Sequence, residues 1–266
     1  MPPPLAREVG QGFKHQRETT ALVELDDRLE ACPTWSAGEL CPLQFGRRFH
    51  TPPVAAALIT LVLLSYLLGS IPTGFLVAKA KGVDIRSVGS GNIGATNVFR
   101  ILGKGAGIFV LTADALKGVF VVVVIAPAVQ RITPAGAIVE HLPALAGICA
   151  ILGHNYTCWL KFKGGKGIAT TAGVFAALAP AAFGIALATW LVVFAASRYV
   201  SLASIVAAVA LPLAVWLTGN GGLLIGVSAA LGALAIYKHK ANIERLLAGT
   251  ENRIGAKKPE PPETKT

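Results

Sequence analysis

Residues 54–78 read VAAALITLVLLSYLLGSIPTGFLVA and contain no charged side chain. A helix of about 17–25 apolar residues is long enough to cross the hydrocarbon core of a bilayer. Further apolar segments follow at residues 106–129, 142–160, 168–179, 181–196, 200–217 and 223–237. Several of these are near the lower length limit, so the sequence supports five to seven spans. We predict an all-α, polytopic integral membrane protein with about seven transmembrane helices.

The composition agrees with a membrane protein and excludes two other classes. Hydrophobic residues make up 53% of the 266 residues and charged residues 14%, with a mean hydropathy of +0.61. The net charge of +10 does not indicate a nucleic-acid partner, because there is no basic stripe with interleaved aromatic residues. The four cysteines, Cys32, Cys41, Cys149 and Cys158, lack the spacing of a metal site. We expect no metal, no cofactor and no disulfide framework.

Lysine and arginine residues are distributed unevenly between the predicted spans. The odd-numbered connections contain Lys79, Lys81, Arg86, Arg100, Lys104, Lys161, Lys163, Lys166 and Arg198. The even-numbered connections contain Arg131 alone. Cytoplasmic loops carry the excess of positive charge in membrane proteins. The N-terminus is therefore predicted outside, and the odd connections and the basic C-terminal segment in the cytoplasm.

The first 53 residues do not fit this topology. They are polar and without clear periodicity, and Arg47 and Arg48 lie on the side that would be translocated. Met1 is the single methionine of the chain. Two explanations stay open: a start codon assigned too far upstream, with the natural start near Val54 or Leu58, or a genuine disordered extension. The expected organisation is a poorly ordered extension (1–53), a membrane-embedded domain (54–238), a cytoplasmic motif (239–255) and a disordered tail (256–266).

Two glycine-rich, cationic stretches lie between the apolar segments. They are RSVGSGNIGATNVFR at residues 86–100 and KFKGGKGIATT at residues 161–171. Residues 89–94 match the dinucleotide fingerprint in letters, but a membrane span precedes them where a strand is needed. The second stretch fails as a Walker A motif, because Leu160 and Gly167 occupy positions that require Gly and Ser or Thr.

The physical basis shared by those motifs still applies to both stretches. Glycines let successive backbone N–H groups converge on an anion. In the first stretch, neutral donors and a bidentate cation are added by Ser90, Asn92, Thr96, Asn97 and Arg100. In the second, Gly164, Gly165 and Gly167 surround Lys166, and Thr170 and Thr171 follow. Both predict phosphate binding, against the alternative of tight interfacial loops that contact lipid headgroups.

The remaining polar residues of the apolar segments are less specific. Asp114 and Lys117 stand at i, i+3 spacing, and we interpret them as an internally neutralised pair. For His154 and the adjacent Asn155, a structural hydrogen bond and a catalytic role are both open. Ser201 and Ser204 are residues of the kind that pack helices together. The spacing of residues 239–245 alone predicts a solvated basic helix.

Three long segments, taken together, resemble the bacterial acyl-phosphate:glycerol-3-phosphate acyltransferases. They are GSIPTGFLVAKAKGVDIRSVGSGNIGATNVFRILGKG (69–105), GHNYTCWLKFKGGKGIATTAGV (153–174) and KHKANIERLLAGTENRIG (238–255). The resemblance covers about residues 54–254, and the first 53 residues have no counterpart in it. Three long motifs in the right order make it specific.

The resemblance implies roles for individual positions. Ser90 and Arg100 match an essential serine and arginine. The cage for the phosphoryl group of the acyl donor matches Gly89, Gly91, Asn92, Gly94, Thr96 and Asn97. The glycerol-phosphate loop matches Gly164, Gly165, Lys166 and Gly167, followed by Thr170. His239 and Asn242 match residues needed for activity, Glu251 a structural glutamate, and Ser201 and Ser204 hydroxyls that line the site.

The implied function is transfer of a fatty acyl group from an acyl phosphate to the C1 hydroxyl of glycerol 3-phosphate. The products would be 1-acyl-glycerol 3-phosphate and phosphate, made at the cytoplasmic face of the bacterial inner membrane. Expected partners are both substrates and membrane lipid, with docking of the soluble enzyme that forms the acyl phosphate left open.

Other classes fit the sequence less well. A transporter should show internal repeats and polar residues near the bilayer midplane, and we find no clear repeat. An acyl-CoA-dependent enzyme usually carries His-x4-Asp, whereas this chain has His239 and Glu244 at that spacing. A phosphotransferase that acts on lipid alcohols would need clustered aspartates to bind Mg²⁺, and the sequence contains no such cluster.

Overall fold

The computed structural model describes residues 54–134, 136 and 138–255, and this part of the chain contains helices and no strands. The expectations for residues 1–53 and 256–266 lie outside the described residues. In chain order the elements are α2 (Val54–Ser70), α3 (Thr73–Ala80), α4 (Ala95–Leu102), α5 (Lys104–Phe120), the π-helical turn η3 (Val121–Ile125), α6 (Ala126–Gln130), the 3-10 turn η4 (Val139–His141), α7 (Leu142–Asn155), the 3-10 turn η5 (Cys158–Leu160), α8 (Ile168–Leu178), α9 (Pro180–Ser197), α10 (Val200–Leu217), α11 (Gly222–Lys238) and α12 (Lys240–Leu247).

Four stretches are long and apolar enough to cross a membrane. They are Val54–Ala80, Lys104–Gln130, Pro180–Ser197 and Val200–Leu217. A fifth is added if α11 and α12, which meet at a bend of 58°, count as one span. Each of the seven apolar segments of the sequence is helical over most of its length. The all-helical membrane class is thus confirmed, while the count of seven spans and their orientation stay predictions.

The third apolar segment ends as a helix earlier than predicted. The apolar segment predicted at residues 142–160 is interrupted by His154, Asn155 and Thr157, and α7 stops at Asn155 with η5 following after a break. Lys161 and Phe162 then adopt left-handed backbone conformations, with φ of 53° and 59°. This turn brings the chain back onto the end of α7, where the second glycine-rich stretch is held. The polar residues at the end of α7 and the returning loop, which bonds to its last carbonyls, therefore end the helix before Leu160.

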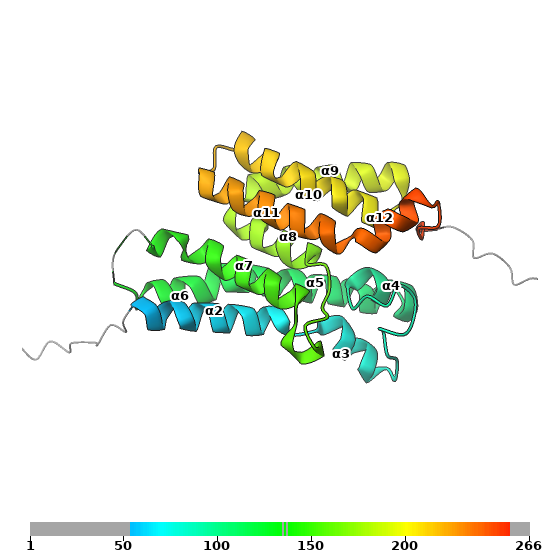
Figure 1. Cartoon of the computed structure of the whole chain (residues 1–266), viewed down its shortest axis with the longest axis horizontal. Helices are drawn as coiled ribbons and strands as arrows, with labels where there is room; N and C mark the ends of the chain where they lie inside the picture. The colour runs from blue at the N-terminus through cyan, green and yellow to red at the C-terminus, as the bar shows by residue number, and fades with distance from the viewer. Residues whose placement is uncertain (1–53, 135, 137, 256–266) are drawn as a thin grey trace, which may run out of the picture. The chain divides into compact units, whose positions relative to one another are not determined.

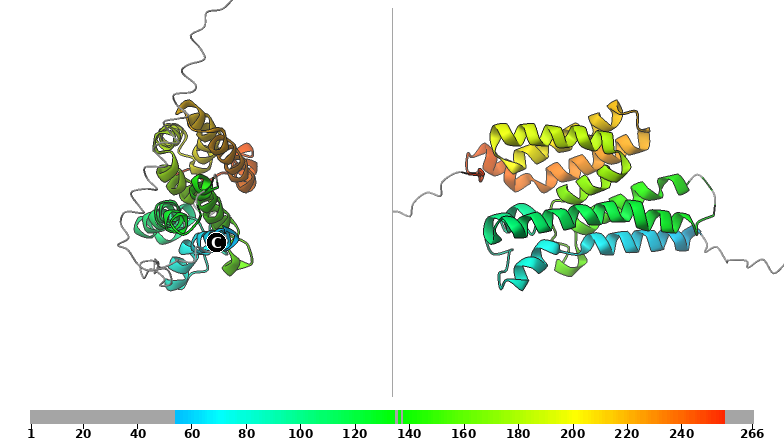
Figure 2. Two further views of the ribbon diagram at one scale, coloured as in Figure 1. Left: turned by 90° about the vertical axis from the view of Figure 1, so that its left-hand side faces the viewer. Right: turned by 180° about the vertical axis from the view of Figure 1, so that it is seen from behind.

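The short helix α8 is the centre of the packing. It contacts α5, α7 and α9, and α9 packs in turn against α10, which packs against α11. Figures 1 and 2 show α8 between the group formed by α2, α5 and α7 and the group formed by α9, α10 and α11. With eleven residues α8 is about 16 Å long, roughly half the thickness of a bilayer core.

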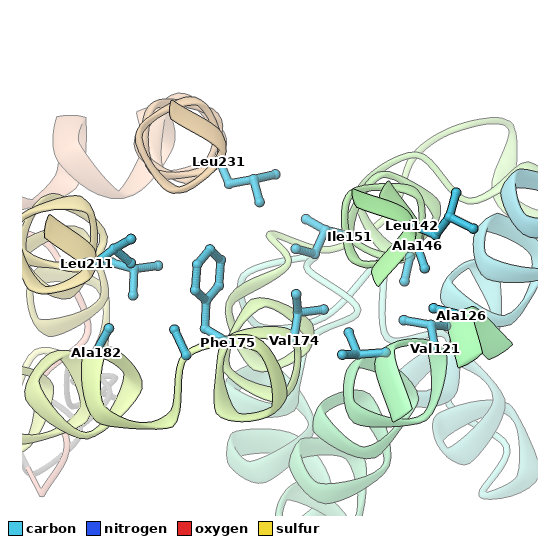
Figure 3. Close-up of a cluster of buried hydrophobic side chains, with 14 of the residues drawn as sticks. Val121, Ala126, Leu142, Ala146, Ile151, Val174, Phe175, Ala182, Leu211 and Leu231 are labelled. Carbon is cyan, nitrogen blue, oxygen red and sulfur yellow. The ribbon is translucent and has the colours of Figure 1, made fainter. Parts of the chain in front are cut away.

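Apolar side chains fill the space around α8. Phe175 is 1% exposed and projects between Leu211 of α10 and Leu231 of α11 (Figure 3). The neighbouring Val174 lies on the other side of α8, toward Ile151 of α7 (Figure 3). This single core joins both groups of helices, so the loop at the N-terminus of α8 is fixed relative to both.

A buried ion pair supports the break between α2 and α3. Asp114 and Lys117 of α5 are 2.8 Å apart, and both are almost fully buried. The Lys117 ammonium donates to the carbonyl of Ile71 at 3.1 Å, and Asp114 accepts a hydrogen bond from Thr73 Oγ1 at 3.0 Å. The interpretation of Asp114 and Lys117 as an internally neutralised pair is confirmed. Lys117 thus supplies a donor to the backbone next to Pro72, which has no N–H, and Asp114 holds the side chain of the first residue of α3.

Close contact between α5 and α8 depends on glycine at Gly173. A methyl group there would overlap the backbone of Ala115, so we expect Gly173→Ala to lower stability by about 1–3 kcal/mol. The matched control is Gly184→Ala on α9, where an added methyl meets no atom within 4 Å. Thermal unfolding in detergent measures both variants. Equal melting temperatures for the two would contradict the close packing described here.

Candidate active site

A cavity of about 770 Å³ lies between the helices, lined by residues of α4, α5, α8, α9, α10, α11 and α12 and of the loops beside them. Its polar lining consists of Ser90, Asn92, Thr96, Asn97, Arg100, Lys104, Asp114, His154, Lys166, Thr171, Ser201, Ser204, His239, Asn242, Arg245, Glu251 and Asn252. Its apolar part is lined by Ile108, Leu111, Phe175, Phe183, Leu187, Trp190, Phe194, Leu211 and Leu231. Residues of all three motif segments therefore face one space, which continues among apolar side chains.

The first glycine-rich stretch is organised by the side chain of Asn97. Its Oδ1 accepts from the N–H of Ser90 at 3.0 Å, and its Nδ2 donates to the carbonyls of Ile85, Val88 and Asn92 at 3.0–3.2 Å. The sequence suggested that Asn97 is a donor to a phosphate. The structure shows that its carboxamide is engaged by the backbone of its own loop.

Two glycines give this loop its curl. Gly89 and Gly91 have φ of 63° and 70°, a region that side chains with a Cβ rarely adopt. A Cβ at Gly89 would also overlap the Asn97 carboxamide. Gly89 and Gly91 do not line the cavity, whereas Ser90 between them does. The glycines therefore shape the loop and present Ser90.

The second glycine-rich stretch is attached to the end of α7. The N–H groups of Gly164 and Gly165 donate to the carbonyls of Asn155 and His154 at 3.2 and 3.0 Å. A Cβ on Gly165 would overlap the His154 imidazole, so only glycine lets the loop pack directly against this ring. His154 is buried, with Nδ1 3.8 Å from an oxygen of Asp114. Both main-chain and side-chain atoms of His154 support the loop.

Lys166 begins a chain of polar contacts that reaches the C-terminal segment. Its ammonium donates to Asn242 Oδ1, and Asn242 Nδ2 donates to Glu251 Oε1 at 2.8 Å. The Glu251 carboxylate also accepts from Ser201 Oγ at 3.0 Å and from Arg245 Nε at 2.7 Å. Glu251 thus joins α10, α12 and the segment after α12. Sequence reasoning did not single out Arg245, because nothing in the motif marks it as the partner of Glu251.

The environment of the loop shifts several protonation equilibria. Burial lowers the pKa of Lys166 to about 8, and the nearby charges of Arg245 and Arg100 act in the same direction against that of Glu251. Burial disfavours the charged form of Glu251, but the hydrogen bonds that it accepts more than offset this, so its pKa lies below the usual value. Lys166 is therefore a cation that neutralises at mildly alkaline pH.

His239 lies between α11 and α12 and is 3% exposed. Its Nδ1 is 2.7 Å from the carbonyl of Ala235, so Nδ1 carries the proton and Nε2 is the free acceptor. Burial, together with the charge of Lys166, lowers the pKa of His239 to about 4. The imidazole is neutral at pH 7 and a weak base.

The remaining predicted positions differ in their access to the cavity. Ser204 lines it but donates to the carbonyl of Val200 at 2.8 Å and accepts from Trp190 Nε1 at 3.1 Å. Gly94 and Gly167 also line it. Thr170 does not, and its buried hydroxyl has no hydrogen-bond partner among the described residues. The binding role of Thr170 stays a prediction.

Taken together, the fold and this cavity define an all-helical integral membrane protein with a cationic, glycine-rich site at one end of its helices. The chain belongs to the glycerol-3-phosphate acyltransferase family, whose sequence profile matches residues 59–249. The glycerol-3-phosphate acyltransferase of Geotalea daltonii is 52% identical over 194 residues, which are 73% of this chain and 96% of the relative. That of Geobacter metallireducens is 53% identical over 201 residues, 75% of this chain and all of the relative.

Two solved structures are similar to this fold. Both are of PlsY (YgiH), described as an integral membrane glycerol 3-phosphate acyltransferase. The glycerol 3-phosphate form is 43% identical and has a TM-score of 0.68, and the lysophosphatidic acid form is 42% identical with a TM-score of 0.66. Each match covers 75% of this chain and 96% of the other. The resemblance seen in the three motifs is thereby confirmed at the level of the family.

Proposed function

We propose that this protein transfers a fatty acyl group from an acyl phosphate to the C1 hydroxyl of glycerol 3-phosphate. The products are 1-acyl-glycerol 3-phosphate and inorganic phosphate. The observation that carries the proposal is the composition of the large cavity, where Arg100 and Lys166 lie in the same space as a long apolar surface. A cavity of this kind suits a substrate with a charged head and a hydrocarbon chain.

The first glycine-rich loop holds the phosphoryl group of the donor. Ser90, Asn92 and Thr96 offer donors, and Arg100 offers a planar pair of N–H groups suited to phosphate oxygens. All four line the cavity near its polar end. The acyl chain then extends along the apolar lining, which includes Phe175 and Trp190.

The second glycine-rich loop holds the phosphate of the acceptor. The N–H groups of Gly164 and Gly165 are bound to α7, so these two residues position Lys166, which supplies the charge, and the N-terminus of α8 after Gly167 supplies backbone donors. Asn242 and Glu251 position Lys166 through the contacts described above. Asn242 is thus assigned mainly to orienting this lysine.

The reaction itself needs positioning and electrostatic stabilisation. The C1 hydroxyl oxygen attacks the acyl carbonyl carbon, forming the ester bond. The bond from that carbon to the phosphate oxygen breaks, and phosphate leaves with the electron pair. Arg100 and Ser90 stabilise the charge that develops on the leaving phosphate.

The proton of the C1 hydroxyl goes to an oxygen of the donor phosphate. His239 is the alternative acceptor, but a pKa of about 4 makes it a weak base at neutral pH. His239 instead accepts a hydrogen bond at Nε2 from a substrate hydroxyl and orients it. The active end faces the cytoplasm of the inner membrane, as the distribution of lysine and arginine residues favours.

The donor is tested by offering palmitoyl phosphate and palmitoyl-CoA separately to purified protein with glycerol 3-phosphate. We expect lysophosphatidate only from the acyl phosphate, because the first loop is built around a phosphoryl group. Release of inorganic phosphate in equal amount confirms the stoichiometry. Activity with the thioester alone would overturn the donor assignment.

Two substitutions test the division of labour between the loops. Arg100→Ala should abolish activity while the protein stays folded in the membrane, because the donor phosphate loses its cation.

Gly165→Ala should chiefly raise the KM for glycerol 3-phosphate, because the added methyl displaces the loop from His154. Initial rates at varied concentrations of each substrate measure both effects. An unchanged KM in Gly165→Ala would argue against the acceptor role of this loop.

The lowered pKa of Lys166 predicts a pH dependence. The Lys166 side chain is positively charged below about pH 8 and loses this charge as the pH rises through that value. Since the acceptor's phosphate is fully ionised there, kcat/KM for glycerol 3-phosphate should fall above about pH 8. Lys166→Arg keeps its charge, so its profile should stay flat to higher pH even if its activity is lower. A fall at the same pH in both proteins would assign the titration to another group.

A further inference from the structure

A second cavity of about 530 Å³ lies beside the first, between the second glycine-rich loop and the junction of α11 with α12. It is lined by Asn92, Gly164, Gly165, Lys166, Tyr237, Lys238, Lys240, Ala241 and Glu244. Asn92 and Lys166 line both cavities, so these two residues form their shared wall. Gly164 and Gly165 face the second cavity and do not line the first.

The charge in the second cavity is strongly biased. Three ammonium groups, those of Lys166, Lys238 and Lys240, line it together with one carboxylate, that of Glu244. Among the described residues, none of these lysines has a carboxylate within ion-pair distance. The lining is therefore a cationic surface that attracts small anions.

One of these cations is held firmly in place. The Lys238 ammonium donates to the carbonyl of Asn155 at 3.0 Å and lies 4.5 Å from the centre of the Tyr156 ring. The same Asn155 carbonyl accepts from Gly164. Lys238 is thus fixed next to the loop, while Lys240 and Glu244 on α12 are exposed.

The two cavities differ in what they suit. The first continues along apolar residues such as Leu111 and Leu187, which are 51% and 41% exposed on the surfaces of membrane helices. The second has no comparable apolar wall among its lining residues. A lipid-soluble donor fits the first cavity, and a water-soluble anion fits the second.

We propose that the second cavity is the access port through which the acceptor, a small phosphorylated polyol, reaches Lys166 from water. The positive charges of Lys238 and Lys240 attract this anion, and the negative charge of Glu244 repels it. The port rests on the proposed function, because it takes the second glycine-rich loop as the acceptor site. Each substrate then has its own route, so a bound acyl donor does not block the acceptor.

Charge reversals on α12 test the port. Lys240→Glu should lower kcat/KM for glycerol 3-phosphate by roughly 3- to 10-fold at low ionic strength, and Glu244→Lys should raise it. Both effects should disappear near 1 M salt, where the screening length is about 3 Å. kcat and the KM for palmitoyl phosphate should stay unchanged, because the donor uses the other route. The matched control is Lys81→Glu, an exposed lysine that lines neither cavity.

The outcomes separate the port from the function on which it rests. Opposite, salt-dependent effects of the two α12 reversals, confined to glycerol 3-phosphate, support the port. Effects equal to that of Lys81→Glu would overturn it, as would equal effects on both substrates. Gly165→Ala is measured in the same assays. If it leaves the KM for glycerol 3-phosphate unchanged, the acceptor loop itself is wrongly assigned, whatever the reversals show.

Discussion

Two backbone hydrogen bonds, from the N–H groups of Gly164 and Gly165 to the last carbonyls of α7, determine where the functional residues lie. They bind a loop without regular structure to a helix that is packed on several sides. Lys166 follows directly and is thereby brought to Asn242, a residue 76 positions away in the chain. From there Glu251 connects to Ser201 and Arg245. A polar network across three parts of the chain therefore starts from one loop attachment.

This attachment explains why small residues are needed at particular points. The loop can approach α7 only because Gly165 leaves room for the imidazole of His154. The helix that follows the loop can approach α5 only because Gly173 leaves room for Ala115. Without a strong hydrophobic force between helices inside lipid, close backbone contact at small residues is one source of specific packing, beside hydrogen bonds between helices. Fold and site thus depend on the same property of glycine.

Much of this could be predicted from the sequence. The apolar run at residues 54–78 and the charge distribution indicate a helical membrane protein, and the glycine-rich motifs identify the family. Other features could not be predicted, since they arise from contacts between distant residues. The use of Asn97 by its own loop depends on the curl at Gly89 and Gly91. The attachment of the returning loop to the last carbonyls of α7 depends on the left-handed turn at Lys161 and Phe162. The cationic cavity beside Lys238 depends on how α11 packs against α7 and bends into α12.

The wall shared by the two cavities has a consequence for the physical state of the reactants. On one side of Asn92 and Lys166 the lining is cationic and without an apolar wall, and on the other the first cavity continues past polar residues to the apolar side chains of the membrane helices. In the proposed reaction, a solute that cannot enter a bilayer becomes an amphiphile that cannot leave one. The chemical step therefore also transfers the acceptor from water into the bilayer. The partition of the product into lipid removes it from the acceptor's side and favours the forward direction without any carrier for the product.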